Sequence, residues 1–134
     1  MKKMAAQLED HRPRVVLEEA ESVDGHFRQK GFIDTEPDVR IPFWLLKPAT
    51  EGPYPLAVLP HGHDRIGHDT YAGVYRDDGH EQQTLAGERD VAVQAVKRGF
   101  LAIAPATRGL AVDGVPDVYA RHDKRDCRSQ LMML

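Results

Sequence analysis

The stretch that decides the fold is Pro55–His63, Pro-Leu-Ala-Val-Leu-Pro-His-Gly-His. Leu56–Leu59 is a short, unbroken apolar run between two prolines, a pattern typical of a strand covered on both faces, as in a parallel sheet. The run ends in Pro-His-Gly-His at 60–63, four residues that cannot continue a strand ladder. Since sites in open α/β sheets form outside the carboxyl ends of strands, we expect the functional corner of the protein here.

The chain after this corner predicts a strand–helix–strand unit. A loop rich in Gly, Asp and His runs from residue 60 to about residue 83. Thr84–Arg98 is predicted to be a helix, with Thr84 as its N-cap and Gly99 as its C-terminal stop. Phe100–Ala104 is a second continuous apolar run and predicts a strand parallel to the first, with a right-handed crossover between them.

The chain before the corner predicts antiparallel strands. Arg14–Leu17 is expected to be a short strand, and Phe27–Ile33 and Val39–Leu46 an antiparallel hairpin around a turn-forming segment at 34–38. Pro42 lacks a backbone donor and is expected to confine the second arm to a sheet edge or a bulge.

Two boundaries follow from this pattern. Residues 1–13 are a polar leader, and residues 14–134 form one partial α/β domain. At the other end, Cys127, Leu131 and Leu134 lie on one face of a predicted final helix. The printed sequence stops inside that pattern without a helix-ending residue, so we expect an incomplete domain.

Composition excludes several classes of protein. The 134 residues are 41% hydrophobic and 29% charged, with a net charge of −3, which fits a globular domain and provides no basic stripe for nucleic acid. The single cysteine, Cys127, excludes an intrachain disulfide and favours a reducing, cytoplasmic location. No segment has the apolar length of a signal peptide core or a membrane span.

The paired signals His-Gly-His after one strand and Ala-Pro-Ala-Thr-Arg-Gly after the next resemble the opening half of an α/β-hydrolase. The narrower resemblance is to the dienelactone hydrolase and acetyl xylan esterase branch, and it covers the N-terminal portion only. It is carried by Leu56–His63, Glu88–Arg98 and Gly99–Gly109, with a weaker likeness through Arg121–Leu134.

The resemblance implies a set of site residues. The backbone N–H of His63 would be one donor of an oxyanion hole, and Gly62 would allow the loop to turn that amide outward. His61 and Arg108 would support the two loops by hydrogen bonds. The resemblance implies a small-molecule ester substrate and no cofactor or metal.

The sequence departs from the family pattern at the nucleophile. The elbow Gly-x-Ser-x-Gly is absent, and the only serines are Ser22 and Ser129, neither of which is placed at a strand-to-helix turn. We therefore expect the N-terminal part of an esterase-type hydrolase that is inactive alone. The strand order of the family implies that the strand at 56–59 would lose a sheet neighbour here, so we also expect a homo-oligomer or a partner chain to cover that edge.

Other interpretations of the same residues stay open. The chain could be a non-catalytic α/β module that acts through self-assembly or a partner chain. A metal-binding hydrolase is a third, less favoured interpretation, because zinc could use donors of this loop. Those donors are His61, His63, Asp64, His68, Asp69 and His80. Cys127 is interpreted as a buried structural thiol rather than a nucleophile.

Overall fold

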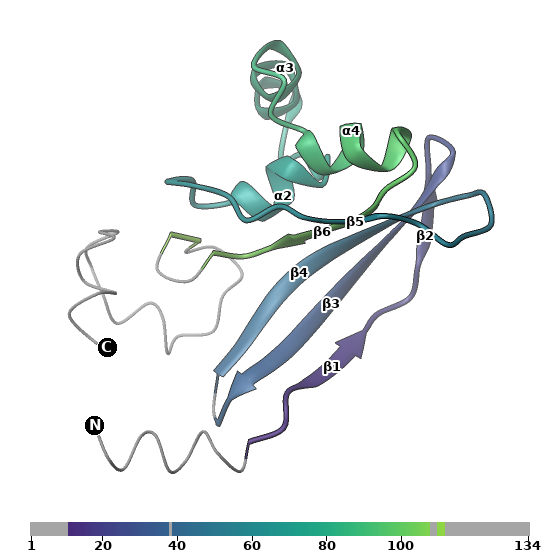
Figure 1. Ribbon diagram of the computed structural model, residues 1–134. Helices are drawn as coiled ribbons and strands as arrows, with labels where there is room; N and C mark the ends of the chain where they lie inside the picture. Colours follow the sequence, from purple (N-terminus) through teal and green to yellow (C-terminus); the bar gives the residue numbers. More distant parts are fainter. Residues whose placement is uncertain (1–10, 38, 108–109, 112–134) are drawn as a thin grey trace.

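A computed structural model describes residues 11–37, 39–107 and 110–111. Its centre is a mixed sheet in the order β1-β3-β4-β6-β5, with β2 paired to β3 (Figure 1). The strands are β1 (Arg14–Leu17), β2 (Glu21–Val23), β3 (His26–Glu36), β4 (Val39–Pro48), β5 (Leu56–Val58) and β6 (Leu101–Pro105); the helices are α2 (Gly67–Tyr71), α3 (Asp78–Ala86) and α4 (Val91–Lys97). This partial α/β sheet is the fold class that the sequence predicts.

The β3–β4 hairpin is the longest pairing in the sheet and confirms the predicted one. Both arms are rich in aromatic and β-branched residues, and they pair antiparallel from His26 with Pro48 to Glu36 with Val39. Gly31 lies opposite Phe43, and a Cβ at Gly31 would lie only 2.8 Å from Phe43 Cε1. Glycine at this position therefore allows the Phe43 ring to lie across the neighbouring strand.

Pro42 is a correction to the sequence prediction. It was expected at a sheet edge or a bulge, but β4 lies between β3 and β6, and Pro42 is in regular register with Phe32. The ladder between β4 and β6 begins one residue later, at Phe43, and the Pro42 carbonyl accepts a hydrogen bond from Ala106 N–H at 2.9 Å. Since the N and C=O of one strand residue point to the same side, the Pro42 nitrogen faces Ala106, and the bond that proline cannot make is the reciprocal one to the Ala106 carbonyl, just beyond the end of the ladder.

A short hairpin before β3 was missed in the sequence. β2 pairs antiparallel with the start of β3, and the turn consists of Asp24 and Gly25, with φ of 45° and 82°. Asp-Gly between two short strands is a strong local signal for such a two-residue turn, so the sequence did contain the information.

The single helix predicted at 84–98 is wrong, because the structure contains two helices there. Asp77, not Thr84, is the N-cap of the first, α3, and its Oδ1 accepts the His80 N–H at 2.7 Å. Thr84 lies inside α3 and is fully buried. The helix ends at Ala86, with Gly87 as its C-cap. The next residue, Glu88, has a φ of 50°, a backbone conformation that cannot continue a helix. Gly99, with φ of 90°, does follow the end of α4 as predicted.

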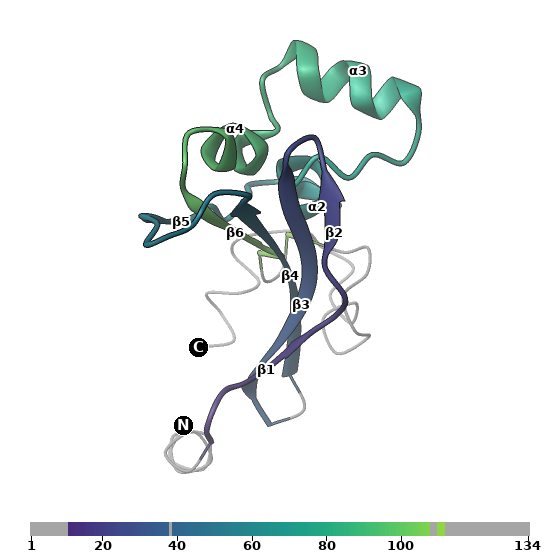
Figure 2. The ribbon, with the colours of Figure 1, turned by 90° about the vertical axis from the view of Figure 1, so that its right-hand side faces the viewer.

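The three helices lie on one side of the sheet (Figures 1 and 2). α2 and α4 pack on β4 and β6, whereas α3 stands farthest from the strands. α2 lies within the segment predicted to be a loop. The buried core between helices and sheet consists of Leu46, Ala72, Ala92, Val96, Ala102 and Ala104. Small residues dominate this list, which allows the helix axes to approach the strands closely.

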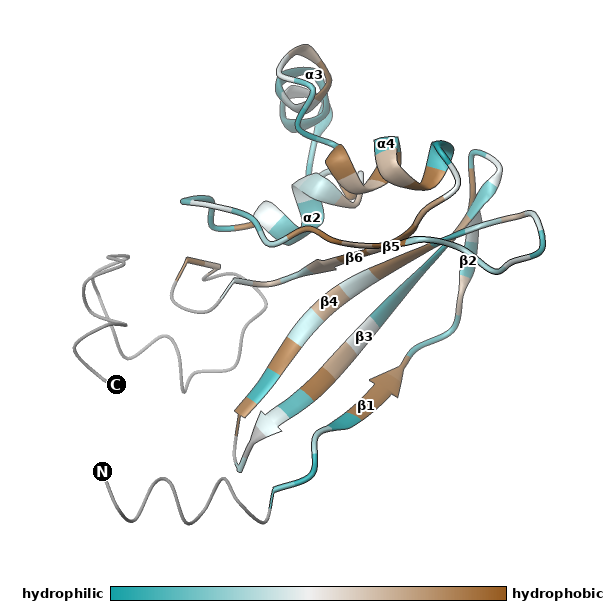
Figure 3. Cartoon of the chain, viewed as in Figure 1, coloured by the Kyte–Doolittle hydropathy of each residue, from teal (hydrophilic) through white to brown (hydrophobic). Residues whose placement is uncertain are grey.

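β5 is the edge strand of the described sheet and pairs only with β6, in parallel. The expectation that Leu56–Leu59 is covered on both faces is wrong, because Leu56 is 59% exposed and Val58 56% exposed. Leu59 packs against the core instead. The apolar colour of this strand at the sheet margin is visible in Figure 3.

Two sequence predictions concern residues outside the described part of the chain. The final helix over Cys127–Leu134 lies outside it entirely, and most of the leader at 1–13 does as well. Among the helices that the structure describes, none has the length and apolarity needed to cross a membrane.

Candidate functional site

The candidate site lies where β5 and β6 end. Because the two strands are parallel neighbours, their carboxyl ends meet at the same edge of the sheet. The Leu59 N–H donates to the Ile103 carbonyl at 2.8 Å and extends the pairing to the last residue before the Pro-His-Gly-His turn. The turn after β5 and the residues after β6 are thereby brought side by side.

His61 fastens these two loops together. Its Nε2 accepts the Thr107 N–H at 2.9 Å, and the Thr107 hydroxyl donates to the His61 carbonyl at 2.7 Å. Nδ1 lies 2.8 Å from the Gly62 carbonyl. Since Nε2 must accept, the hydrogen-bond network assigns the proton of the neutral ring to Nδ1, which donates to Gly62. We name this reciprocal pair of bonds the His61–Thr107 clasp.

The clasp requires a neutral imidazole. His61 is 3% exposed, and burial lowers its pKa below the ordinary 6.5, although the Gly62 carbonyl and the Asp64 and Asp69 carboxylates oppose the shift. A proton on Nε2 would remove the acceptor for the Thr107 N–H. The geometry therefore uses His61 as a hydrogen-bonded link between loops.

Gly67 makes room for the His61 ring. A Cβ on Gly67 would lie 2.6 Å from His61 Cβ and closer still to the ring atoms, so it would clash sterically with the His61 side chain. On the adjacent positions, His68 stacks near His61 with ring centroids 6.0 Å apart, and Tyr71 meets the ring edge-on at 6.3 Å. α2 therefore forms the wall of the clasp, a role that the sequence did not predict because residues 60–83 were expected to be a loop.

α2 is itself held by the sheet. The Trp44 Nε1–H of β4 donates to Asp69 Oδ1 at 2.7 Å, and His68 Nε2 lies 3.5 Å from the same oxygen. The Arg28 Nη1–H of β3 donates to the Gly73 carbonyl at 2.8 Å, at the C-terminal end of α2. Burial lowers the pKa of His68 although Asp69 opposes this, so His68 is a neutral packing residue at neutral pH.

The turn that carries His63 is shaped by Asp64. The Asp64 N–H donates to the Gly62 carbonyl at 2.8 Å, and Asp64 Oδ1 accepts the Ile66 N–H at 3.0 Å. Asp64 Oδ2 pairs with the Arg89 guanidinium. Burial would raise the pKa of Asp64, but the Ile66 N–H and Arg89 together hold that pKa below its ordinary value.

His63 is exposed and lines an open depression of about 470 Å³. The other lining residues are Asp64, Arg65, Arg89 and Leu110. Gly62 has a φ outside the left-handed region, and a Cβ there would meet no atom within 4 Å. The conformation of Gly62 is thus accessible to other residue types, and its expected role in turning the His63 amide stays a prediction.

Three of the four predicted site residues, His61, Gly62 and His63, are consecutive and lie in the turn after β5, and their expected roles in an oxyanion hole stay predictions. Arg108 lies outside the described residues. Thr107, the partner of His61, was missed; the only signal for it was a hydroxyl residue directly after the Ala-Pro-Ala that ends the second strand.

The donors considered for a metal do not form a metal site. Within residues 11–37, 39–107 and 110–111, no three His, Cys, Asp or Glu side chains lie close enough to hold an ion. His80 Nε2 lies 2.9 Å from the Thr70 hydroxyl, and its Nδ1 accepts the Arg76 N–H at 3.2 Å. Ser22, the one described serine, lies in β2 and is exposed, far along the chain from any strand-to-helix turn.

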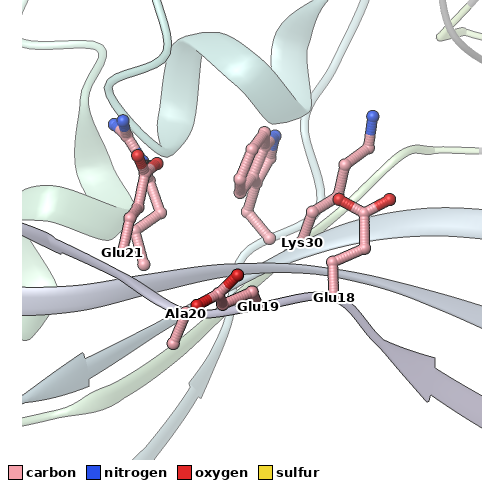
Figure 4. Close-up of a pocket in the computed structure, with 7 residues that line it drawn as sticks. Glu18, Glu19, Ala20, Glu21 and Lys30 are labelled. Carbon is pink, nitrogen blue, oxygen red and sulfur yellow. Dashed lines mark hydrogen bonds and ion pairs between the residues drawn. The ribbon is translucent and has the colours of Figure 1, made fainter.

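A second open depression, of about 490 Å³, lies elsewhere on the sheet, and Figure 4 shows it. It is lined by Glu18, Glu19, Ala20, Glu21, Arg28, Lys30 and Trp44. Arg28 pairs with Glu21 at 2.8 Å, and the Arg28 and Lys30 cations lie 5.6 and 5.8 Å from the centre of the Trp44 ring. The chain's own cations thus lie against the indole, and no residue of the clasp borders this depression.

No protein-family model matches the chain, and no curated protein sequence matches it either. Solved structures do match. A candidate acetyl xylan esterase from Bacteroides fragilis aligns with a TM-score of 0.61 and 19% identity, over 98% of this chain and 35% of its own. Acetyl xylan esterase 1 from Thermoanaerobacterium aligns with a TM-score of 0.55 and 19% identity, over 82% of this chain and 29% of its own.

The fold is that of part of an α/β-hydrolase domain. The chain spans about one third of the length of the solved esterases that it matches. At this level of identity the likeness concerns the arrangement of strands and helices, which agrees with the partial sheet expected from the sequence.

Proposed function

We propose that this chain is the N-terminal part of an esterase-type hydrolase, in which the His63 backbone N–H is one donor of the oxyanion hole. The observation that carries the proposal is the His61–Thr107 clasp. Two hydrogen bonds, of 2.9 and 2.7 Å, fix the turn before His63 against the loop after β6. The turn is thereby held at the carboxyl end of two parallel strands, where sites of α/β sheets form.

The chemistry requires such rigidity. An oxyanion donor lowers the barrier only if its N–H is already aimed at the oxygen on which charge develops, and one such donor contributes about 3–4 kcal/mol to transition-state stabilisation. Because a buried imidazole holds the loop in place, little of this transition-state stabilisation is spent on reorganising the loop. His61 and Gly62 act in this proposal through the position of the His63 amide, and Arg108 supports the second loop.

The nucleophile must come from outside the printed sequence. No Gly-x-Ser-x-Gly occurs in the 134 residues, and Ser22 lies in an exposed hairpin strand. The substrate is a small-molecule ester, and the chain alone is inactive. A cytoplasmic location completes the proposal, because the single cysteine needs no oxidising compartment.

The exposed edge supports a second candidate, a non-catalytic module that acts through assembly. Within the part of the chain that the structure describes, β5 pairs only with β6, and two of its apolar side chains, Leu56 and Val58, are each more than half exposed. Such an edge is prone to pair with another strand. In this candidate a second copy or a partner chain completes the sheet.

The sequence encoded after Leu134 separates the two candidates. A continuing reading frame with Gly-x-Ser-x-Gly, followed by Asp or Glu and then His, is expected for the hydrolase, and the extended protein should hydrolyse p-nitrophenyl acetate. The 134-residue chain should show no turnover above background. A stop codon after Leu134 would contradict the hydrolase and favour assembly, and turnover by the short chain that a serine-directed phosphonate abolishes would contradict the assignment of an absent nucleophile.

A further inference from the structure

The face of the sheet opposite the helices is apolar. The register of the strands shows which side chains share a face, because directly paired residues of neighbouring strands point to the same side. Leu46, Ala102 and Ala104 of the buried core lie on the side of the helices, so the strand residues that alternate with them lie on the other side. We name that side the helix-free face, because none of the three described helices packs on it (Figures 1 and 2).

Exposed apolar side chains are concentrated on the helix-free face. The described part of the chain exposes seven large hydrophobic side chains, and five of them belong to this face: Val15, Leu17, Phe27, Leu56 and Val58. The other two are Val16, on the opposite side of β1, and Leu85, on α3. Leu45 pairs with Ile103 and Ile103 with Val58, so the apolar surface is continuous from β4 to β5. A contiguous patch of this kind marks an interaction surface, whereas single exposed apolar residues do not.

The helix-free face has the size and charge that contact with a second copy requires. Its five strands, β1, β3, β4, β6 and β5, give a projected area of roughly 500 Å² at about 3.3 Å per residue and about 4.8 Å between strands. Protruding side chains add to this area, which brings it toward the roughly 600–1,000 Å² per partner of a stable interface. Among the residues in regular register on this face, Lys47 is the charged one, and it lies near the end of β4. Two copies would therefore bring no like charges together at the centre.

We propose that two copies of the 134-residue chain associate through their helix-free faces, as two sheets packed face to face. Packed sheets lie about 10 Å apart, with strand directions within about 30° of each other. A two-fold pair uses the same patch on both copies, which an apolar face without central charge satisfies. Since β4 is the middle strand of the order β1-β3-β4-β6-β5, Phe43 and Leu45 of one copy would contact β4 of the other. The contact uses side chains of interior strands, so it differs from pairing along the β5 edge and depends on neither candidate function.

Sedimentation equilibrium of the 134-residue chain and two matched variants tests this surface. Phe27→Glu places a carboxylate on the helix-free face of an interior strand, opposite Lys47, where a cross-strand ion pair limits the loss of stability. Val16→Glu is the control, because Val16 is 40% exposed, as Phe27 is 42% exposed, but its pairing with Phe32 places it on the side of the helices. We expect a dimer for the unaltered chain and for Val16→Glu, and a dissociation constant at least about tenfold higher for Phe27→Glu, because the dimer would bury its charge.

NMR on a sample that mixes isotopically labelled and unlabelled copies locates the contact without any substitution, so the proposal stays testable if Phe27→Glu does not fold. We expect intermolecular NOEs from the methyl groups of Leu45, and none from the methyl group of Ala92, which is buried between α4 and the sheet. A monomeric unaltered chain, equal dissociation constants for the two variants, or intermolecular NOEs confined to the β1 or β5 edge would overturn the proposal.

Discussion

His61 and Thr107, which are 46 residues apart in the sequence, are joined by two hydrogen bonds that run in opposite directions. The ring of His61 accepts from the Thr107 backbone, and the Thr107 side chain donates to the His61 backbone. Each residue thus provides one backbone group and one side-chain group. A pair of this kind fixes both the distance and the relative direction of the two loops at the carboxyl ends of β5 and β6.

Removal of the His61 imidazole should destabilise the protein. His61→Ala leaves the Thr107 N–H without its acceptor and opens space above Gly67, and we expect a loss of about 1–3 kcal/mol in the free energy of unfolding in urea. Thr107→Val removes only the hydroxyl bond and should cost about 1 kcal/mol. If His61→Ala unfolded at the same urea concentration as the unaltered chain, the clasp would not contribute to stability.

A side chain at Gly67 should be far more harmful than one at Gly62. Gly67→Ala places a Cβ against the His61 ring and should cost about 1–3 kcal/mol, because a well-packed site cannot absorb another methyl group without moving. Gly62→Ala is the matched control, since a Cβ there meets no atom within 4 Å. Thermal unfolding of both variants measures the difference. Equal melting temperatures would show that the ring does not rest on Gly67.

Stability should fall as the pH is lowered below the ordinary histidine range. The pKa values of His26, His61 and His68 all lie below 6.5, in each case mainly because of burial. The unfolded chain then binds more protons than the folded one, so the stability that these groups contribute is complete above pH 6.5 and is lost as the pH falls through the folded pKa values. Both ring nitrogens of His26 lack a hydrogen-bond partner among the described residues. If the ring of His26 is protonated in the folded protein, no hydrogen bond from these residues offsets the cost of burying the charge.

The measurement for this prediction is the free energy of unfolding at about pH 7.5 and about pH 5. We expect a clear decline, and a shallower one in His61→Asn, which removes one of the three titrating rings. A free energy that stays constant or rises toward about pH 5 would contradict the assignment of neutral buried rings.

A charge on the β5 edge should reduce self-association. Val58→Lys places a cation on the exposed apolar edge, where it opposes strand pairing, and the weight-average mass in sedimentation equilibrium should fall toward that of a monomer. Leu85→Lys is the control, because Leu85 is also exposed, at 51%, but lies on α3 away from this edge. If the unaltered chain is already monomeric, or if both variants behave alike, β5 is not the associating surface.

Local signals predicted five of the six described strands, all except β2, and the end of one helix. The apolar runs at 39–46 and 100–104 form β4 and β6, and Gly99 adopts the left-handed conformation that follows the end of a helix. The break between α3 and α4 was missed because Gly87 alone is a weak signal for the end of a helix. The positive φ occurs at Glu88, and glutamate, unlike glycine, is not a residue type from which a positive φ is predicted. Thr84 resembled an N-cap by type, but its buried position in α3 depends on packing.

The amino-acid sequence by itself determined where the strands run and that polar residues follow the end of β5. The spacing of apolar residues and the positions of proline and glycine set these features, because they affect the backbone only over a few neighbouring residues. Only the tertiary structure decided that Thr107 is the partner of His61, that Gly67 is the glycine that the site requires, and that β5 is exposed. These features depend on atoms that are distant in sequence and meet only after the sheet has formed. Local pattern contains no information on which of several suitable neighbours a buried ring will meet.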